Sequence, residues 1–197
     1  MIARPFLICI ALLLATLAGC KVDSIQPLSA ADNAKPDTAL YGVWRYREKD
    51  EVTYLHIGPA FSLDPAVAAN GAGRPMRIVL VDHKASGLSD EAYTAHASRL
   101  GARRYLNVLQ LEDGKPAGYL FVQYARVDAD TLRFASVDGK ALRAAIANGE
   151  IAGRVEGEGP AAQATITADP AALARYFERD GAKLFTKWFV LKRVAER

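Results

Sequence analysis

Three consecutive stretches decide the fold: RRYLNVLQLE (103–112), GYLFVQYARV (118–127) and TLRFASV (131–137). All three are rich in aromatic and aliphatic residues, and the links between them, DGKPA (113–117) and DAD (128–130), are short and polar. Short polar links between such stretches are typical of antiparallel neighbours. In the middle stretch both alternating sets of side chains are largely apolar, which predicts a strand covered on both faces. The sequence therefore predicts a three-stranded meander.

Further strands are predicted on both sides of the meander. They are a hairpin over 42–58 that turns at 48–50, a strand over 76–82, a strand pair over 150–158 and 161–168, and a closing strand over 183–194. The stretch 59–75 is rich in Ala, Gly and Pro, and we interpret it as a long loop that could act as a lid.

Three short helices are predicted from capping residues and apolar spacing. They cover 90–100 after Ser89, 139–148 after Asp138, and 170–180 after Asp169, and a glycine follows each of them. The fold class that follows is mainly β (α+β). We expect one antiparallel sheet of about eight strands, strongly curved or closed into a β-barrel, with the helices outside it or at an end.

The N-terminus has the pattern of an export signal. A charged start precedes an apolar run over 6–18, which is too short for a comfortable membrane span. The tetrapeptide LAGC (17–20) resembles the lipobox of bacterial lipoproteins. That resemblance implies a signal peptide over 1–19 and a lipidated Cys20. Because Lys21 follows the cysteine instead of Asp, it also implies a palmitate-bearing anchor in the outer membrane, facing the periplasm.

After the lipobox, residues 20–39 lack hydrophobic periodicity and contain Pro27 and Pro36. We interpret them as a flexible tether to a single globular domain over 40–197, the alternative being an ordered arm packed along the domain. Of the 197 residues 51 % are hydrophobic, enough for a sizeable core. The net charge of +3 gives no electrostatic reason to expect nucleic acid as a partner.

The sequence offers little support for catalysis or for a bound metal or cofactor. His56, His83 and His96 are far apart and outside any ligand-spaced motif, and no nucleophile motif is present. The glycine-containing stretch GEGPAA (157–162) is followed by strand-like residues instead of a helix, so it indicates a turn and not a dinucleotide site. A hydrolase would need Asp82, His83 or His96 to converge with other polar groups in a cleft.

Aromatic residues on the predicted strands are the remaining candidates for a site. If the sheet closes into a barrel, they could line an apolar cavity; the alternative is an ordinary filled core. The residues that we expect to line such a cavity are Trp44, Tyr54, Tyr119, Phe121, Phe134 and Trp188.

The stretch YGVWRY (41–46) resembles the G-x-W signature on the first strand of lipocalins. In that family a basic residue of the last strand packs over the Trp and closes the barrel base. The resemblance implies that Arg193, or alternatively Lys192, covers Trp44, and that the barrel binds a small apolar molecule. The predicted helices at 90–100 and 139–148 depart from the lipocalin pattern.

Three functional hypotheses follow. The first is a lipid-anchored, non-catalytic module that binds an apolar or lipid-like ligand. The second is an envelope interaction or assembly lipoprotein that presents a surface to a protein partner. The third is a hydrolase of unrecognised type.

Overall fold

The structure is a computed structural model that describes residues 22–31, 34–49, 51–60, 75–159 and 162–195. Its elements in chain order are β1 (Val22–Ser24), η2 (Thr38–Leu40), β2 (Gly42–Glu48), β3 (Glu51–Pro59), β4 (Met76–Lys84), β5 (Gly87–Leu100), β6 (Arg103–Glu112), β7 (Lys115–Arg126), β8 (Thr131–Ser136), α3 (Gly139–Ala147), β9 (Gly153–Glu156), β10 (Gln163–Ile166), α4 (Pro170–Arg179), η4 (Gly181–Leu184) and β11 (Phe189–Arg193). Within these ranges no helix is long and apolar enough to cross a membrane.

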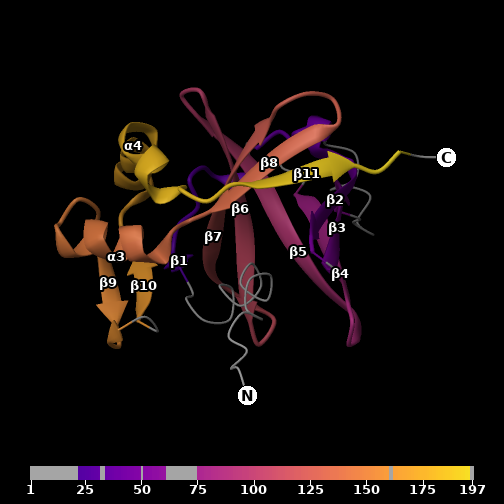
Figure 1. Cartoon of the computed structure of the whole chain (residues 1–197). Coiled ribbons are helices and arrows are strands. Elements are labelled where there is room, and N and C mark those ends of the chain that lie inside the picture. The colour runs from indigo at the N-terminus through magenta and orange to yellow at the C-terminus, as the bar shows by residue number, and fades with distance from the viewer. Residues whose placement is uncertain (1–21, 32–33, 50, 61–74, 160–161, 196–197) are drawn as a thin grey trace, which may run out of the picture.

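Eight strands close an antiparallel barrel (Figure 1). Each strand from β2 to β8 pairs with the next one in the chain, and β11 pairs with both β8 and β2. The closed ring satisfies the backbone N–H and C=O groups that an open sheet would leave at its edges. The predicted fold class, a mainly antiparallel β-barrel of about eight strands with few helices, is confirmed.

One predicted helix, 90–100, is wrong, because these residues form most of β5. This strand pairs with β4 over its first half and with β6 over its second half. The same residues alternate along a strand as well as along a helix face: Tyr93, Ala95 and Ala97 belong to the barrel interior, while His96 and Ser98 face outward. Pairing with two neighbours therefore overrides the local helix signals.

The other two predicted helices are confirmed as α3 and α4, and both have the predicted aspartate caps. The Asp138 carboxylate accepts hydrogen bonds from the backbone N–H groups of Lys140 and Ala141, and Asp169 caps α4 in the same way. The closing strand is shorter than predicted. Only Phe189–Arg193 is extended, because Gly181–Leu184 forms a 3-10 turn before it.

The sheet forks at β7. Towards its C-terminal end, β7 pairs with β8, the last pair being Val122 with Ser136. Nearer its start, β7 instead meets β1 at the pair Tyr119–Ser24, and β1 continues into β10 and β9. The branch β1–β10–β9 leaves the barrel on the side where α3 and α4 lie (Figure 1).

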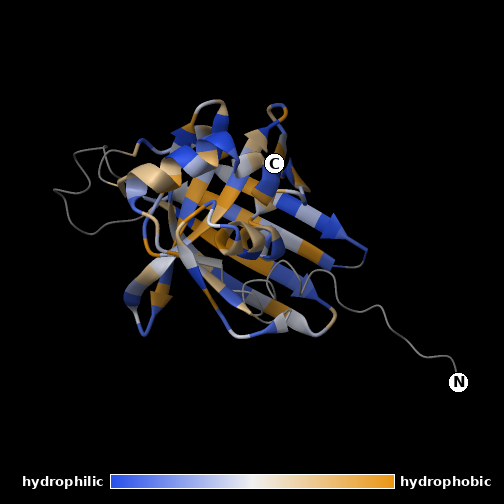
Figure 2. Cartoon of the chain, turned by 90° about the vertical axis from the view of Figure 1, so that its left-hand side faces the viewer, coloured by the Kyte–Doolittle hydropathy of each residue, from blue (hydrophilic) through white to orange (hydrophobic). Residues whose placement is uncertain are grey.

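Two hydrophobic clusters result, one on each face of β6 and β7. The inner cluster fills part of the barrel, with Leu106, Tyr124 and Leu132 among its buried members. The outer cluster lies between the barrel wall and the two helices, with Tyr105 and Phe177 near its centre. Figure 2 views the molecule from the helix side and shows hydrophobic residues gathered in the sheet behind the helices. The prediction that the middle meander strand is covered on both faces is confirmed.

The flexible tether predicted over 20–39 is not what the described part of this segment forms. Residues 22–31 and 34–40 pack along the barrel as an ordered arm, which was the alternative interpretation. Leu28 is buried in the outer cluster, and its backbone N–H donates to the buried Asn107 side chain at 2.7 Å. The arm is ordered because it contributes an apolar anchor and satisfies polar groups on the outer face of β6. The lipobox with Cys20 and most of the 59–75 loop lie outside the described residues.

Candidate functional site: a cavity inside the barrel

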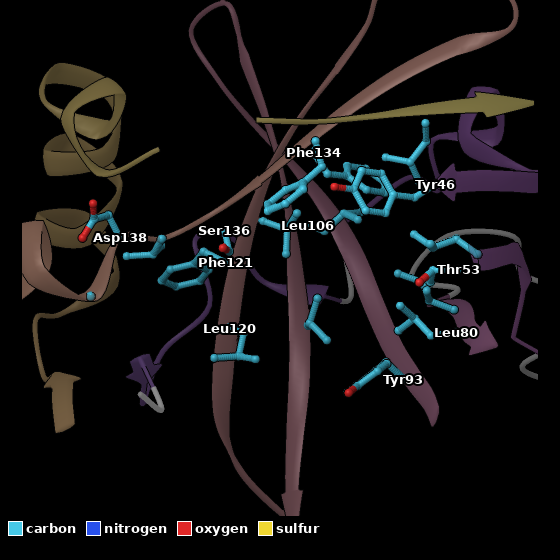
Figure 3. A pocket seen from close by; sticks show the side chains of 18 of the residues that line it. Tyr46, Thr53, Leu80, Tyr93, Leu106, Leu120, Phe121, Phe134, Ser136 and Asp138 are labelled. Atoms are coloured by element: carbon cyan, nitrogen blue, oxygen red, sulfur yellow. The ribbon is translucent and has the colours of Figure 1, made fainter. Parts of the chain in front are cut away.

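A cavity of about 360 Å³ occupies part of the barrel and extends to the fork of the sheet (Figure 3). This volume lies at the lower end of the range found for small-molecule sites. Its wall is mostly apolar, and it is lined by Tyr46, Thr53, Leu55, Ile78, Leu80, Tyr93, Leu106, Val108, Leu120, Phe121, Val122, Phe134, Ser136, Val137, Asp138, Gly139, Lys140, Arg143, Phe189 and Leu191.

Strand alternation explains which side chains reach the cavity. In β2 and β3 the pairs Trp44–Leu55 and Tyr46–Thr53 place four side chains on the inner face, so their neighbours point outward. Several inward-facing side chains nevertheless remain partly exposed, namely Tyr46, Leu80, Tyr93, Leu120, Val122 and Phe189. The barrel is therefore hollow at these positions and open to solvent.

The base of the barrel is filled by Trp44, whose exposed fraction is 0 %. The Arg193 guanidinium carbon lies 4.1 Å from the Trp44 ring centroid, so the contact predicted between these two residues is present. The Trp44 indole N–H donates to the carbonyl of Leu40, which is also buried. A cation–π contact at a desolvated ring contributes about 2 kcal/mol. Trp44 and Arg193 thus close this end of the barrel.

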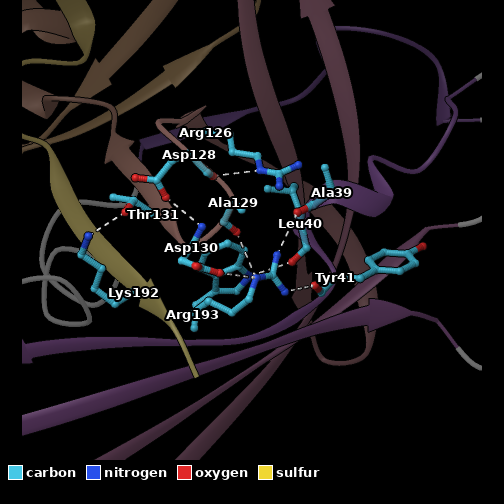
Figure 4. A network of polar contacts seen from close by, with 11 residues as sticks. Ala39, Leu40, Tyr41, Arg126, Asp128, Ala129, Asp130, Thr131, Lys192 and Arg193 are labelled. Atoms are coloured by element: carbon cyan, nitrogen blue, oxygen red, sulfur yellow. Dashed lines mark hydrogen bonds and ion pairs between the residues drawn. The ribbon is translucent and has the colours of Figure 1, made fainter. Parts of the chain in front are cut away.

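Arg193 also ties together three segments at the base (Figure 4). Its Nη1 donates to the Tyr41 carbonyl at 2.8 Å and its Nε donates to the Ala129 carbonyl at 3.2 Å. Gly42 has a φ of +127°, and a Cβ at this position would lie 2.5 Å from Nη1 of Arg193. The glycine of YGVWRY is therefore required both by its backbone conformation and by the space that Arg193 occupies.

Polar groups are few inside the barrel, and most of them have partners; among the described residues the buried amide nitrogen of Gln110 has none. The Thr53 hydroxyl donates to the buried Asp82 carboxylate at 2.5 Å, and Lys84 lies 3.5 Å from the same carboxylate. The Tyr93 hydroxyl donates to Glu91. Burial raises the pKa of Tyr93 above its ordinary value, and the Glu91 carboxylate raises it further, so Tyr93 stays protonated.

Two of the predicted lining residues line the cavity: Phe134 lies on its inner wall, and Phe121, which belongs to the outer cluster, borders it at the fork. The other four do not. Trp44 lies below the cavity in the sealed base, and Tyr54 faces outward, where its ring is 5.1 Å from His83. Tyr119 packs against the outer cluster, and Trp188 lies before β11, under the Arg133 guanidinium at 4.8 Å. Aromatic content alone did not reveal the register that separates inner from outer positions.

The lining residues that were not predicted from the sequence include most of the aliphatic side chains of the wall, together with Tyr46, Lys140 and Arg143. Tyr46 is two positions after Trp44 on the same strand, so strand alternation would have placed it on the inner face. Lys140 and Arg143 could not be found in this way, because only the fork of the sheet brings α3 beside the cavity.

The residues that a hydrolase would need do not converge. Asp82 is buried inside the barrel, whereas its neighbour His83 is exposed and contacts Tyr54 on the outer face. His96 lies under the arm, where its Nε2 is 2.8 Å from the Ser29 carbonyl. Among the described residues, no group of three or more His, Cys, Asp or Glu side chains could hold a metal ion.

The fold and site define an eight-stranded antiparallel barrel with an apolar, solvent-connected cavity and a sealed base. No protein-family model, curated protein or solved structure matches the chain.

Proposed function

We propose that the protein is a non-catalytic binding module that holds an apolar or lipid-like ligand in the barrel cavity. The observation that carries this proposal is the cavity of about 360 Å³ with its mostly apolar wall. Eight-stranded barrels have an interior that is either filled by side chains or able to hold one small ligand. The partly exposed Leu80, Leu120 and Val122 on the inner face favour the second alternative.

The asymmetry of the barrel also supports this role. One end is sealed by Leu40, Trp44 and Arg193, while the cavity reaches exposed residues, Ser136 and Lys140, at the fork. A ligand would therefore enter from one side and stop at a fixed floor. Burying apolar ligand surface in such a cavity provides a driving force of roughly 25 cal/mol per Å².

The test is to fill the cavity. Leu80→Trp and Leu120→Trp each add a large ring to the cavity wall, from β4 and β7 respectively. We expect each to weaken binding of an uncharged apolar fluorescent dye at least tenfold, about 1.4 kcal/mol, because the dye loses its space. The measurement is a fluorescence titration of the full chain, with native mass spectrometry for any lipid that co-purifies.

Val190→Trp is the matched control, since Val190 is an exposed residue of β11 that does not line the cavity. It should leave dye binding unchanged. Urea unfolding of all three variants shows whether each still folds. The proposal fails if folded cavity variants bind the dye as well as the original chain, or if the original chain does not bind it.

We further propose that the module is lipid-anchored through Cys20 in the outer membrane, facing the periplasm. The support is the LAGC motif at residues 17–20 together with the short apolar run before it. Several acyl chains on one cysteine would give a stable anchor. Mass spectrometry of the mature protein tests this: the first residue should be an acylated Cys20, and an unmodified cysteine or an uncleaved leader would contradict it.

A further inference from the structure

The mouth of the cavity lies where the sheet forks, and charged side chains lie beside it. Beyond the pair Val122–Ser136, β8 no longer covers β7, and the first turn of α3 lies next to the opening. Lys140 is exposed and lines the cavity. Lys187 is exposed, and its ammonium group lies 5.3 Å from the ring centroid of Phe189, which is part of the wall.

The carboxylates around the cavity already have hydrogen-bond donors. Asp138 caps α3 and accepts a further hydrogen bond from the Thr186 hydroxyl at 3.2 Å. Asp82 accepts from Thr53, Glu91 accepts from Tyr93, and Glu48 accepts from Tyr46 at 2.9 Å. These acidic groups are thus held by neighbours within the protein.

The two lysines beside the mouth, Lys140 and Lys187, have fewer partners than these acids. Among the described residues, neither Lys140 nor Lys187 forms an ion pair. A third cation, Arg143, donates from Nη1 to the Ala162 carbonyl at 3.1 Å and adds positive charge at the same place. Asp138 is the only acid among the described residues that line the cavity, against the cations Lys140 and Arg143, and Lys187 lies beside the wall residue Phe189. An anion at the mouth would therefore meet a mainly positive surface.

We infer that the ligand is a single-chain amphiphile whose anionic head, a carboxylate or a phosphate monoester, lies beside Lys140 and Lys187 while its chain lies in the barrel. This inference rests on the proposed function and specifies its ligand class. The apolar wall suits the chain, and the small volume suits one chain rather than two. The positive mouth would fix the orientation, since head and chain meet opposite environments.

The experiment compares ligands that share a twelve-carbon chain and differ only in the head: dodecanoate, dodecyl phosphate, dodecanol and dodecylammonium. Each ligand is titrated into the full chain with the apolar dye bound, at low ionic strength, and displacement of the dye reports its affinity. We expect both anions to bind roughly fivefold more tightly than the alcohol, and the cation more weakly than the alcohol, in line with exposed ion pairs. The two anions distinguish a carboxylate head from a phosphate head. Added salt should reduce the preference.

The double variant Lys140→Gln/Lys187→Gln should lose the preference for anions and keep its affinity for dodecanol. The control Lys35→Gln/Lys115→Gln removes the same amount of charge from lysines that do not line the cavity, and it should keep the preference. If dodecanoate, dodecyl phosphate and dodecanol bind equally well, or if the double variant keeps the preference, this inference is overturned while the binding function stands. If the chain binds the dye but none of the four ligands displaces it, this inference is overturned while the binding function stands; if the chain does not bind the dye, both proposals fail.

Discussion

The two hydrophobic clusters on the two faces of β6 and β7 are packed differently. In the outer cluster, Phe177 is fully buried and its ring lies 4.9 Å from Phe121, 5.7 Å from Tyr105 and 6.0 Å from Phe185, centroid to centroid. In the inner cluster, Leu120 and Val122 face open space although they point into the barrel. The same wall is therefore solid on one side and hollow on the other.

This difference indicates which cluster holds the fold and which one is available to a ligand. A filled aromatic cluster between the barrel wall and α4 stabilises the structure without any help from the barrel interior. Stability of the barrel itself comes from its sealed base and its closed hydrogen-bonded ring, so the middle of the barrel can remain open.

The largest expected effect on stability concerns the filled outer cluster. Phe177→Ala should lower the free energy of unfolding by about 3 to 5 kcal/mol, because it leaves a cavity in a filled cluster. Leu120→Ala, in the hollow wall, should cost less, about 1 kcal/mol, because its side chain is partly exposed and borders the cavity instead of a filled cluster. Urea unfolding measures both variants. Equal losses would mean that the inner face is as tightly packed as the outer one.

A smaller effect is expected at the sealed base. Gly42→Ala should lower the free energy of unfolding by about 1 to 3 kcal/mol, because an alanine is strained at a φ of +127° and its Cβ collides with Arg193. Gly58→Ala on the neighbouring strand is the control: its φ is not positive and a Cβ would meet nothing within 4 Å. Thermal unfolding compares them. If both variants are equally stable, the contact between Arg193 and Trp44 does not depend on the missing Cβ.

The smallest effect concerns the arm, which covers the outer face of β5. Burial lowers the pKa of His96 below its ordinary value, and the hydrogen bond to the Ser29 carbonyl opposes this shift only in part. Below about pH 6.5 the unfolded chain therefore takes up a proton that the folded chain does not, and folding stability falls as the pH falls.

Urea unfolding between about pH 7 and about pH 5 measures this loss. His96→Gln, which keeps a hydrogen-bond donor, should show a smaller decrease in the free energy of unfolding over the same range. An identical decrease in the variant would show that other groups cause it.

Sequence reasoning predicted the features that depend on local pattern. The meander over 103–137 and the caps Asp138 and Asp169 follow from the spacing of residues along the chain. The contact between Trp44 and Arg193 was expected from one tripeptide and one terminal arginine. These features need only neighbours in sequence, or a single resemblance, to be recognised.

The predictions that were wrong concern features that depend on contacts with residues distant in sequence. The stretch 90–100 has helix-like capping and spacing, yet it becomes a strand because β4 and β6 both offer backbone partners. Tyr54 and Trp188 were expected to line the cavity, but register and the start of β11 place them outside. A shift of one residue moves a side chain to the other face, and the position of a single aromatic residue does not fix that register.

The sequence by itself therefore determined a β-rich chain and its strand meander, since alternation, turns and caps are local, whereas the pairing of Trp44 with Arg193 was implied only by the resemblance to lipocalins. Only the tertiary structure decided that the barrel is hollow, that the sheet forks at β7, and that Lys140 of α3 lies at the mouth. Cavities and mouths are what remains after distant segments have packed. Their size and position depend on how completely side chains from distant segments fill the space between them, and the sequence of one segment alone does not show this.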